Sequence, residues 1–206
     1  METKYRTIYA ISIPTGASLE WLHIMTTKAM SLNMSSVMTY STTDFFTCEF
    51  LFATDMINLH DNIMLFKSSS ALDDIMEPDG EVMIRFIDEE LLIFGRFAED
   101  GECHFVVDRL DGPAIVIDEN NYAWISNDDK HRTDGPAVMI SDLREEWWQD
   151  GVFHREDGPA MIQYDGDGKI LFEEWIMSGL ALSDAAIAAI KKRISRKQII
   201  DEILKQ

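Results

Sequence analysis

The spacing of apolar residues changes several times along the first 100 positions, and each change marks a predicted element. Residues 5–13 alternate apolar and polar side chains, as a half-buried strand does. Ser18 then stands in the N-cap position of a segment whose apolar residues recur at helical spacing. In chain order, the predicted elements are a strand at 5–13, a helix at 18–31, strands at 36–40 and 44–53, a helix at 54–66, and strands at 81–87 and 91–97. The order over residues 1–70 is compatible with a small ferredoxin-like α+β unit.

The end of the chain has the pattern of an amphipathic helix. Ser183 is a candidate N-cap, and Ile187, Ile190 and Ile194 recur at the spacing of one helix face. Such an apolar stripe predicts docking on a sheet or contact with a second copy of the chain. We therefore expect an α+β protein with three segments, which are an N-terminal α+β unit at 1–70, an antiparallel β-hairpin repeat region at 71–180 and a C-terminal helical segment at 181–206.

The middle of the chain is a tandem repeat with a period of 23 residues. Its marker, Asp-Gly-Pro-Ala, occurs at residues 111–114, 134–137 and 157–160. Trp124 and Trp147 are also 23 residues apart, and so are His131 and His154, each of which is followed by an arginine. Chance agreement of this many positions at one spacing is negligible, so the repeat determines the architecture of this region.

The copies at the two ends depart from the pattern. The first copy has Asp108 in place of the histidine and Gly101 where the tryptophan would stand. After the third copy the spacing lengthens, because Trp175 lies 28 residues beyond Trp147 and no further Asp-Gly-Pro-Ala follows. Degenerate terminal copies are typical of the caps of repeat arrays.

Each period has room for two short strands and two turns. One strand surrounds the tryptophan, at 122–126 and 145–149, and the other follows the proline. The Gly-Pro step favours an extended entry into that second strand, and the preceding aspartate suits an Asx turn. The arginine two positions earlier can pair with this aspartate or with its equivalent in the next copy, while stacked hairpins would place tryptophan beneath tryptophan. The predicted repeat-locking residues are Trp124, Trp147, His131, Arg132, Asp134, His154, Arg155 and Asp157.

The pattern Trp…Gly-x-x-His-Arg-x-Asp-Gly-Pro-Ala resembles a MORN-like hairpin repeat found in uncharacterised proteins of bacteria, large viruses and bacteriophages. The best copy runs over 147–160, and the resemblance covers about residues 101–180. It implies an antiparallel sheet of consecutive hairpins that serves as a structural or interaction module without catalytic activity. A small acidic protein with such repeats also resembles phage accessory proteins that act on the host, which implies the host cytoplasm as its location.

The negative charge belongs to the repeat region. Of the net charge of -19, residues 71–180 contribute 28 acidic and 8 basic groups, whereas residues 1–70 have 6 acidic and 4 basic groups. Residues 181–206 are basic, with 6 basic and 3 acidic groups. A field of this sign repels nucleic acid and anionic membranes and favours a partner protein with a basic surface, and it also promotes solubility.

Candidate contacts with a partner are the acidic positions of the repeats and one tryptophan. Neighbouring side chains on a strand point to opposite faces, so one indole of the pair 147–148 should enter the core. The other should be exposed, as a protein contact, or covered by another element. Acidic pairs such as 128–129 and 145–146 either mimic the phosphates of a duplex or form a solvated edge. The candidate partner contacts are Trp148, Glu145, Glu146, Asp128, Asp129 and Asp142.

The His-Arg-x-Asp segments contain the residue types of a hydrolase or nuclease site. They recur in register with turn residues, whereas a catalytic constellation is normally single, so we predict a structural role. A metal bridged by His131 and His154 would need two more ligands. Segment 1–70 offers only His23 and His60 with scattered acidic residues. We predict no catalytic residue, no cofactor and no metal.

These observations predict a non-enzymatic protein-binding module in the cytoplasm. Its most specific form is a phage accessory protein that inhibits or redirects a host defence protein through the acidic repeat surface. The alternatives are a DNA-mimic inhibitor of a nucleic-acid-binding protein, or an enzyme with a site near the N-terminal unit. We expect a protein partner with a basic surface rather than nucleic acid or membrane, and a homo-oligomer through the C-terminal helix.

Overall fold

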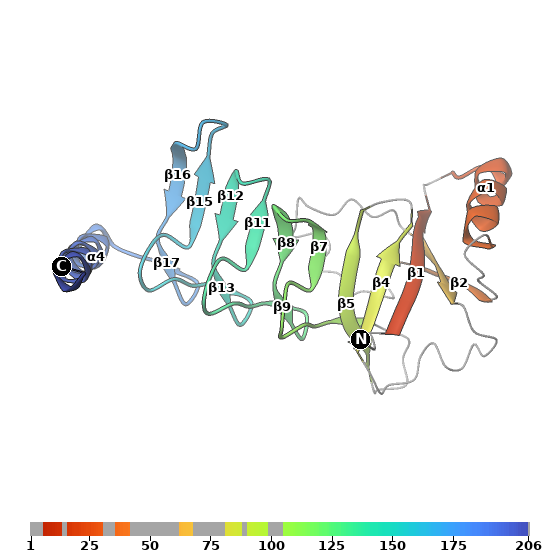
Figure 1. Cartoon of the computed structure of the whole chain (residues 1–206), viewed down its shortest axis with the longest axis horizontal. Helices are drawn as coiled ribbons and strands as arrows, with labels where there is room; N and C mark the ends of the chain where they lie inside the picture. Colours follow the sequence, from red (N-terminus) through yellow and green to blue (C-terminus); the bar gives the residue numbers. More distant parts are fainter. Residues whose placement is uncertain are drawn as a thin grey trace. The chain divides into compact units, whose positions relative to one another are not determined.

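The computed structural model describes residues 6–13, 16–30, 36–41, 62–67, 81–87, 90–98 and 105–205. The chain separates into two compact units, residues 1–128 and 129–206, and each is described by itself. Strands and antiparallel hairpins dominate the described residues of both units (Figure 1), which confirms the predicted α+β class. No helix within these ranges is long and apolar enough to cross a membrane. The segment boundaries expected near residues 70 and 180 stay predictions.

The first unit contains a sheet and helix α1. Its strands are neighbours in the order β2-β3-β1-β4-β5-β7-β8, and β6 pairs with β5. β1 and β4 run parallel, whereas the other described pairs of this sheet are antiparallel. The elements are β1 (Arg6–Ile13), α1 (Leu19–Met30), β2 (Ser36–Ser41), β3 (Asn62–Lys67), β4 (Val82–Phe86), β5 (Leu92–Phe97), β6 (Phe105–Val107), β7 (Ile115–Asp118), β8 (Asn121–Ala123) and β9 (Ile125–Ser126).

The core of the first unit lies on the strands next to β1. Ile8 and Ile84 are fully buried on the paired strands β1 and β4. Trp21 and Met25 of α1 pack against the buried Ile11, so the helix covers one face of β1. Alternation of buried and accessible positions along β4 follows the two-residue period of a strand.

The helix predicted at 54–66 is wrong over residues 62–66, which belong to β3. β3 lies between β1 and β2 and pairs antiparallel with both, so two neighbouring strands satisfy its backbone. A short apolar run does not distinguish a buried strand from a helix, which is why spacing alone fails here. The strand predicted at 44–53 lies outside the described residues, and a ferredoxin-like arrangement is not confirmed.

The second unit alternates long and short hairpins. The long hairpins β11–β12 and β15–β16 form one sheet in the order β11-β12-β15-β16. The short hairpins β13–β14 and β17–β18 lie at the end of each copy away from the tips of the long hairpins (Figure 1). The strands are β10 (Asp129–Lys130), β11 (Val138–Ile140), β12 (Arg144–Glu146), β13 (Trp148–Gln149), β14 (Val152–Phe153), β15 (Met161–Tyr164), β16 (Ile170–Glu174), β17 (Ile176–Met177) and β18 (Leu180–Ala181).

The repeat tryptophan interrupts each strand that was expected to contain it. The segment 122–126 splits at Trp124 into β8 and β9, and the segment 145–149 splits at Trp147 into β12 and β13. The N–H of Trp147 donates to the carbonyl oxygen of Ala160 at 2.7 Å, outside the regular strand pairing. The chain therefore leaves the long hairpin at the tryptophan and turns into the short one.

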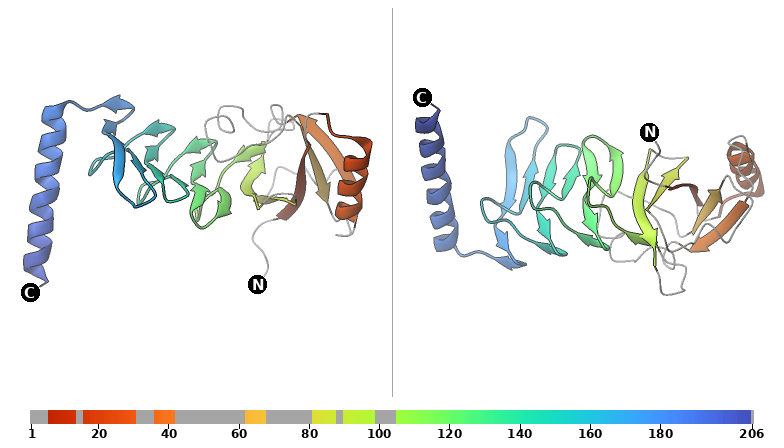
Figure 2. Two further views of the ribbon diagram at one scale, coloured as in Figure 1. Left: turned by 90° about the horizontal axis from the view of Figure 1, so that it is seen from above. Right: turned by 60° about the horizontal axis from the view of Figure 1, so that its bottom comes forward.

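Helix α4 (Asp184–Leu204) follows β18 and confirms the predicted C-terminal helix (Figure 2). The hydroxyl of Ser183 accepts a hydrogen bond from the Ala186 N–H at 3.4 Å, as expected of an N-cap. Ile187, Ile190 and Ile194 are half-buried, and no described residue of α4 is fully buried. The helix thus covers only one part of its apolar surface.

Candidate interaction surface

Each copy of the repeat holds its arginine in the same clamp. The arginine Nε donates to the aspartate two residues later at 2.8–3.0 Å, and Nη1 donates to the proline carbonyl four residues later at 3.1–3.2 Å. The arginine therefore pairs with the aspartate of its own copy, which is one of the two alternatives that the spacing allows. In one clamp the arginine lowers the pKa of Asp134, first through the hydrogen bond and then through its charge. The clamps are Arg109–Asp111–Pro113, Arg132–Asp134–Pro136 and Arg155–Asp157–Pro159.

The clamped guanidinium lies between an aromatic ring and a glycine. The guanidinium carbon of Arg155 is 3.7 Å from the ring centroid of Trp147. On the other side, a Cβ atom added to Gly158 would come within 2.7 Å of that carbon. The glycine of Asp-Gly-Pro-Ala is therefore required for the close approach of the arginine, in addition to its role before proline.

In the first copy Phe94 occupies the position of the repeat tryptophan. Its ring centroid lies 4.0 Å from the guanidinium carbon of Arg109, and its N–H donates to Ala114 as that of Trp147 does to Ala160. The 23-residue spacing of the repeat assigns this position to Gly101, which lies outside the described residues. Phe94 precedes its arginine by 15 residues, whereas Trp147 precedes its own by 8, so a fixed 23-residue period cannot find it.

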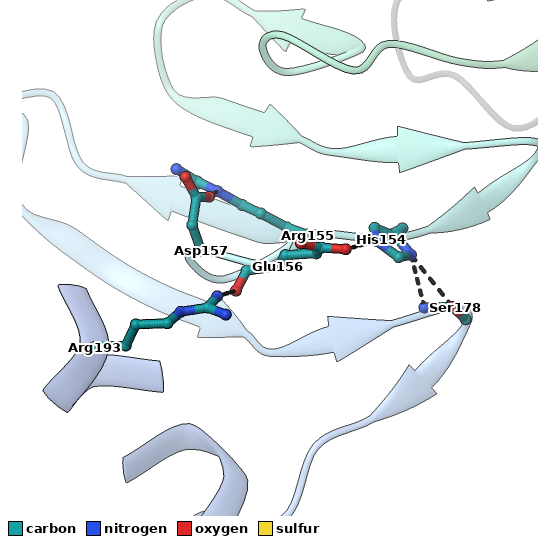
Figure 3. Close-up of polar contacts among 6 residues, drawn as sticks. All are labelled: His154, Arg155, Glu156, Asp157, Ser178 and Arg193. Atoms are coloured by element: carbon teal, nitrogen blue, oxygen red, sulfur yellow. Dashed lines mark hydrogen bonds and ion pairs between the residues drawn. The ribbon is translucent and has the colours of Figure 1, made fainter. Parts of the chain in front are cut away.

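The residue before each arginine connects its copy to the turn of the next short hairpin. Its side chain accepts, at 3.2 Å, the backbone N–H of a turn residue in the left-handed conformation, with φ of 49–50°. Nδ1 is the acceptor in both histidines, and Figure 3 shows this contact for one of them. His131 Nδ1 also lies 2.9 Å from the Asp150 carboxylate, and one ring nitrogen can either accept the N–H or donate to the carboxylate, but not both at once. The three pairs are Asp108 with Asn127, His131 with Asp150 and His154 with Ser178.

Backbone hydrogen bonds follow the same register between successive copies of the second unit. The N–H of Arg132 donates to Trp148, and the N–H of Arg155 donates to Ile176. Clamp, turn contact and backbone bond thus recur together, so a copy is joined to its neighbour at several points. How much the eight predicted locking residues stabilise the fold stays a prediction.

Glu146 is buried, although the sequence predicts that it contacts a partner. Only 4% of the residue is exposed, and its carboxylate lies 3.7 Å from Nζ of Lys130, itself 7% exposed. Trp148 Nε1 donates to the same carboxylate at 2.9 Å, and Arg144 forms an ion pair with it. Such partners are what a buried charge requires. The sequence shows an acidic pair at 145–146, and nothing in that pair distinguishes its buried member.

The two neighbouring indoles are both covered by side chains. Trp148 packs on Phe153 with ring centroids 3.8 Å apart, and Lys130 Nζ lies 4.4 Å from its ring centroid. Trp147 is half-buried beneath Arg155. Trp148 is half-buried as well, so any contact with a partner would use only the edge that remains accessible.

The remaining candidate contacts do not form one patch. Asp142 is exposed at the tip of the β11–β12 hairpin, whereas Asp129 is exposed beside the turn of the short hairpin β13–β14. Glu145 is half-buried and accepts a hydrogen bond from Tyr164, whose pKa is raised by burial first and by this carboxylate second. Asp128 belongs to the first unit, where it accepts a backbone N–H at 2.8 Å. Asp129 and Asp142 are therefore the freely accessible acids of this set.

Helix α4 stands where a further copy would follow the last tryptophan. No clamp arginine follows Trp175, and Lys191 of α4 lies 5.0 Å from its ring centroid instead. Lys191 also pairs with Glu173 at 3.3 Å, and the pKa of Glu173 is lowered first by the Trp175 indole N–H and then by Lys191. Arg193 donates to the backbone carbonyl of Glu156 (Figure 3). These contacts fix the helix on the end of the repeats.

A groove of about 650 Å³ lies between α4 and the preceding loops. Arg193 and Lys197 line it together with Asp157 and Asp201, so its charges are of both signs. Trp147 also lines the groove, and its Nε1 is buried without a hydrogen-bond acceptor among the described residues. The mixed charge selects no single class of ligand.

Within the described ranges, no group of three or more His, Cys, Asp and Glu side chains is placed to hold a metal ion. His23 is exposed on α1, and His60 lies outside these ranges. His131 and His154 are not brought together on one ion but are each engaged with a different turn.

No protein-family model, no curated protein and no solved structure matches this chain. The resemblance to MORN-like repeats therefore stays a prediction that rests on the 23-residue pattern.

Proposed function

We propose that the chain is a non-enzymatic protein-binding module, built on MORN-like hairpin repeats, whose acidic surface binds a basic surface of a partner protein. The observation that carries this proposal is the opposite exposure of cations and carboxylates in the clamps. The three clamp arginine side chains are only 19–21% exposed, whereas their aspartates are 52–77% exposed. The repeats thus hold their cations inward and present carboxylates to the solvent.

Two further cations of the repeats, Lys130 and Arg144, follow the same rule, whereas Lys169 is exposed. The side chain of Lys130 is 8% exposed and that of Arg144 is 33% exposed, and both pair with the buried Glu146. The accessible surface is therefore more acidic than the 28 acidic and 8 basic groups of residues 71–180 already indicate. Such a surface steers a basic partner into contact, and it repels nucleic acid and anionic membranes.

In its most specific form, this module is a phage accessory protein that inhibits or redirects a host defence protein in the host cytoplasm. The repeat resemblance and the acidity support this form. A basic cleft that normally holds nucleic acid would fit the same surface, which makes the DNA-mimic alternative a distinct outcome of the experiment below.

The test is affinity purification from a bacterial lysate with the whole chain and a charge-reversed variant. The variant Asp129→Lys/Asp142→Lys changes the two freely accessible acids of the candidate set, and Asp201→Lys/Glu202→Lys makes the same charge change on α4. We expect the wild type and the α4 control to capture one basic protein, with less captured at 200 mM salt than at 50 mM salt (on the order of tenfold or more). The repeat variant should capture little of it.

Equal capture by the repeat variant, or capture that salt does not weaken, would overturn the proposal. If duplex DNA competes for the captured protein, the acidic surface occupies a nucleic-acid site. Turnover of a nucleotide or nucleic acid by the purified chain, with no protein captured, would instead support the enzyme alternative.

A further inference from the structure

Helix α4 carries an exposed stripe that faces away from the repeats. Lys192, Arg196, Ile199 and Ile203 follow each other at intervals of four, three and four residues, which places them on one helix face. All four are exposed, and 57% of Ile199 and 64% of Ile203 are accessible. The opposite face contains the half-buried isoleucines described above. The outward stripe therefore begins with two cations and ends with two large apolar side chains.

The last long hairpin carries a second exposed apolar surface. Ile170, Leu171 and Phe172 of β16 are 47%, 62% and 46% exposed, and among the described strands β16 pairs only with β15. Asp167 is exposed in the turn that precedes β16. In chain order this surface consists of the acid in the turn, the exposed Lys169 and the large apolar side chains of β16. Exposed apolar surface of this kind on an edge strand marks an interaction site.

Two simple ways for these surfaces to pair with themselves are unfavourable. Antiparallel contact of α4 with its own equivalent would place the cations 192 and 196 of one copy against Ile203 and Ile199 of the other, so charged groups would meet apolar side chains. Pairing of β16 with its own equivalent is hindered by the irregularity in its register with β15, where Leu171 is the extra residue. A bulge of this kind bends the strand and interrupts regular edge pairing.

Contact between the helix stripe and the hairpin surface has neither problem. The stripe from Lys192 to Ile203 extends about 16 Å along the helix. Asp167 lies in the hairpin turn, next to the apolar residues of β16. Cations of the stripe would meet the acid of the turn while the isoleucines meet the apolar residues of β16. The two surfaces therefore match in the order of charged and apolar positions, with Asp167 as the acid that the cations meet.

We propose that a second copy of this chain covers both surfaces, with α4 of each copy against the β15–β16 hairpin of the other. Each copy supplies one helix stripe and one hairpin surface, so a two-fold pair satisfies both at once. The proposal specifies the face and the counterpart of the homo-oligomer contact expected from the sequence, and it is independent of the acidic partner surface.

Sedimentation equilibrium of the whole chain tests the pair. We expect a monomer–dimer equilibrium for the wild type and at least tenfold weaker dimerisation for Leu171→Ser and for Ile203→Ser, because each removes an apolar contact. Arg196→Glu and Asp167→Arg should each weaken dimerisation several-fold, and the combined variant should recover most of the wild-type constant. Glu202→Lys, on α4 but off the stripe, is the matched control and should change little.

A wild type that stays monomeric at about 100 μM would overturn the proposal, as would a combined charge-swapped variant that is weaker than either single variant. Dimerisation that survives Ile203→Ser but is lost in Leu171→Ser would show edge pairing without the helix and would also overturn it. Circular dichroism of each variant checks that it is folded. The lysate capture described above uses different residues, so either proposal can fail while the other holds.

Discussion

Strands β1 and β4 of the first unit are five to eight residues long, and Ile8, Ile84 and Phe86 on them are almost completely buried. The repeat strands of the second unit are only two to five residues long, and recurring polar contacts such as the Arg155 clamp join them. The fold of the first region depends on the packing of buried apolar side chains. The fold of the second region depends on pairs of polar side chains at fixed spacing, and a glycine next to each pair leaves space for the arginine.

The largest effect should come from removing volume in the first unit. Phe86→Ala leaves a cavity in a core where the ring is 2% exposed, and we expect a loss of about 4 kcal/mol in the free energy of unfolding. Guanidinium unfolding measures the loss, and hydrogen exchange should place it in the sheet around β4. Leu110→Ala removes a side chain that is 82% exposed and should change stability by less than about 0.5 kcal/mol. A loss below about 1 kcal/mol for Phe86→Ala would contradict the contrast between the regions.

The next largest effect should come from breaking the buried ion pair between Lys130 and Glu146. Glu146→Ala leaves Lys130 buried without its carboxylate, and we expect a loss of about 3 kcal/mol. Replacing both partners, in Lys130→Met/Glu146→Leu, should restore part of that stability, because the buried ammonium group is removed while Arg144 and the Trp148 indole still lose this carboxylate. If the double variant is less stable than Glu146→Ala, the charge pair itself is what this part of the fold requires.

A smaller effect is expected from filling the space that a clamp needs. Gly158→Ala would place a methyl group against the Arg155 guanidinium, and we expect a loss of about 2 kcal/mol in thermal or chemical unfolding. Gly166→Ala is the matched control, because a Cβ atom there would meet nothing within 4 Å. The cost should shrink when Gly158→Ala is made on an Arg155→Ala background. Equal costs on both backgrounds would show that the arginine is not the obstacle.

The smallest effect should come from one contact between copies. His154→Ala removes the acceptor of the Ser178 N–H, and we expect a loss of about 1 kcal/mol. His154→Asn offers a side-chain oxygen at a similar position and should recover part of the loss, as the first copy already does with Asp108. The order of stability wild type, Asn, Ala supports the hydrogen bond, whereas equal losses for Asn and Ala would indicate that the imidazole acts by packing.

The two regions also differ in how far their sequence predicts their structure. The 23-residue pattern identifies the hairpins, the clamp residues and the point where the array ends, because turn chemistry depends on residue type at fixed spacing. In the first unit, the sequence predicts a helix over residues 62–66, which instead belong to β3 because pairing with β1 and β2 rather than local spacing determines their structure. Non-local pairing of this kind leaves no periodic signal.

Within the repeats, two site residues escape the pattern for different reasons. Phe94 stacks on Arg109 across a spacing that departs from the period, so only the fold reveals it. Glu146 looks like its exposed neighbour in the sequence, and its burial depends on Lys130 from the preceding strand. Candidate contacts read from charge alone therefore include residues that the fold uses internally.

The position of Lys191 over Trp175 has a consequence for how such a chain could change its length. The helix contacts a tryptophan that follows a long hairpin, and the hairpins β7–β8, β11–β12 and β15–β16 are each followed by one. Duplication or loss of a whole 23-residue unit would present the same ring to the same lysine, so the closing element would not need redesign. The number of clamps, and with it the number of outward carboxylates, could then be adjusted by gene duplication alone, in steps of one copy.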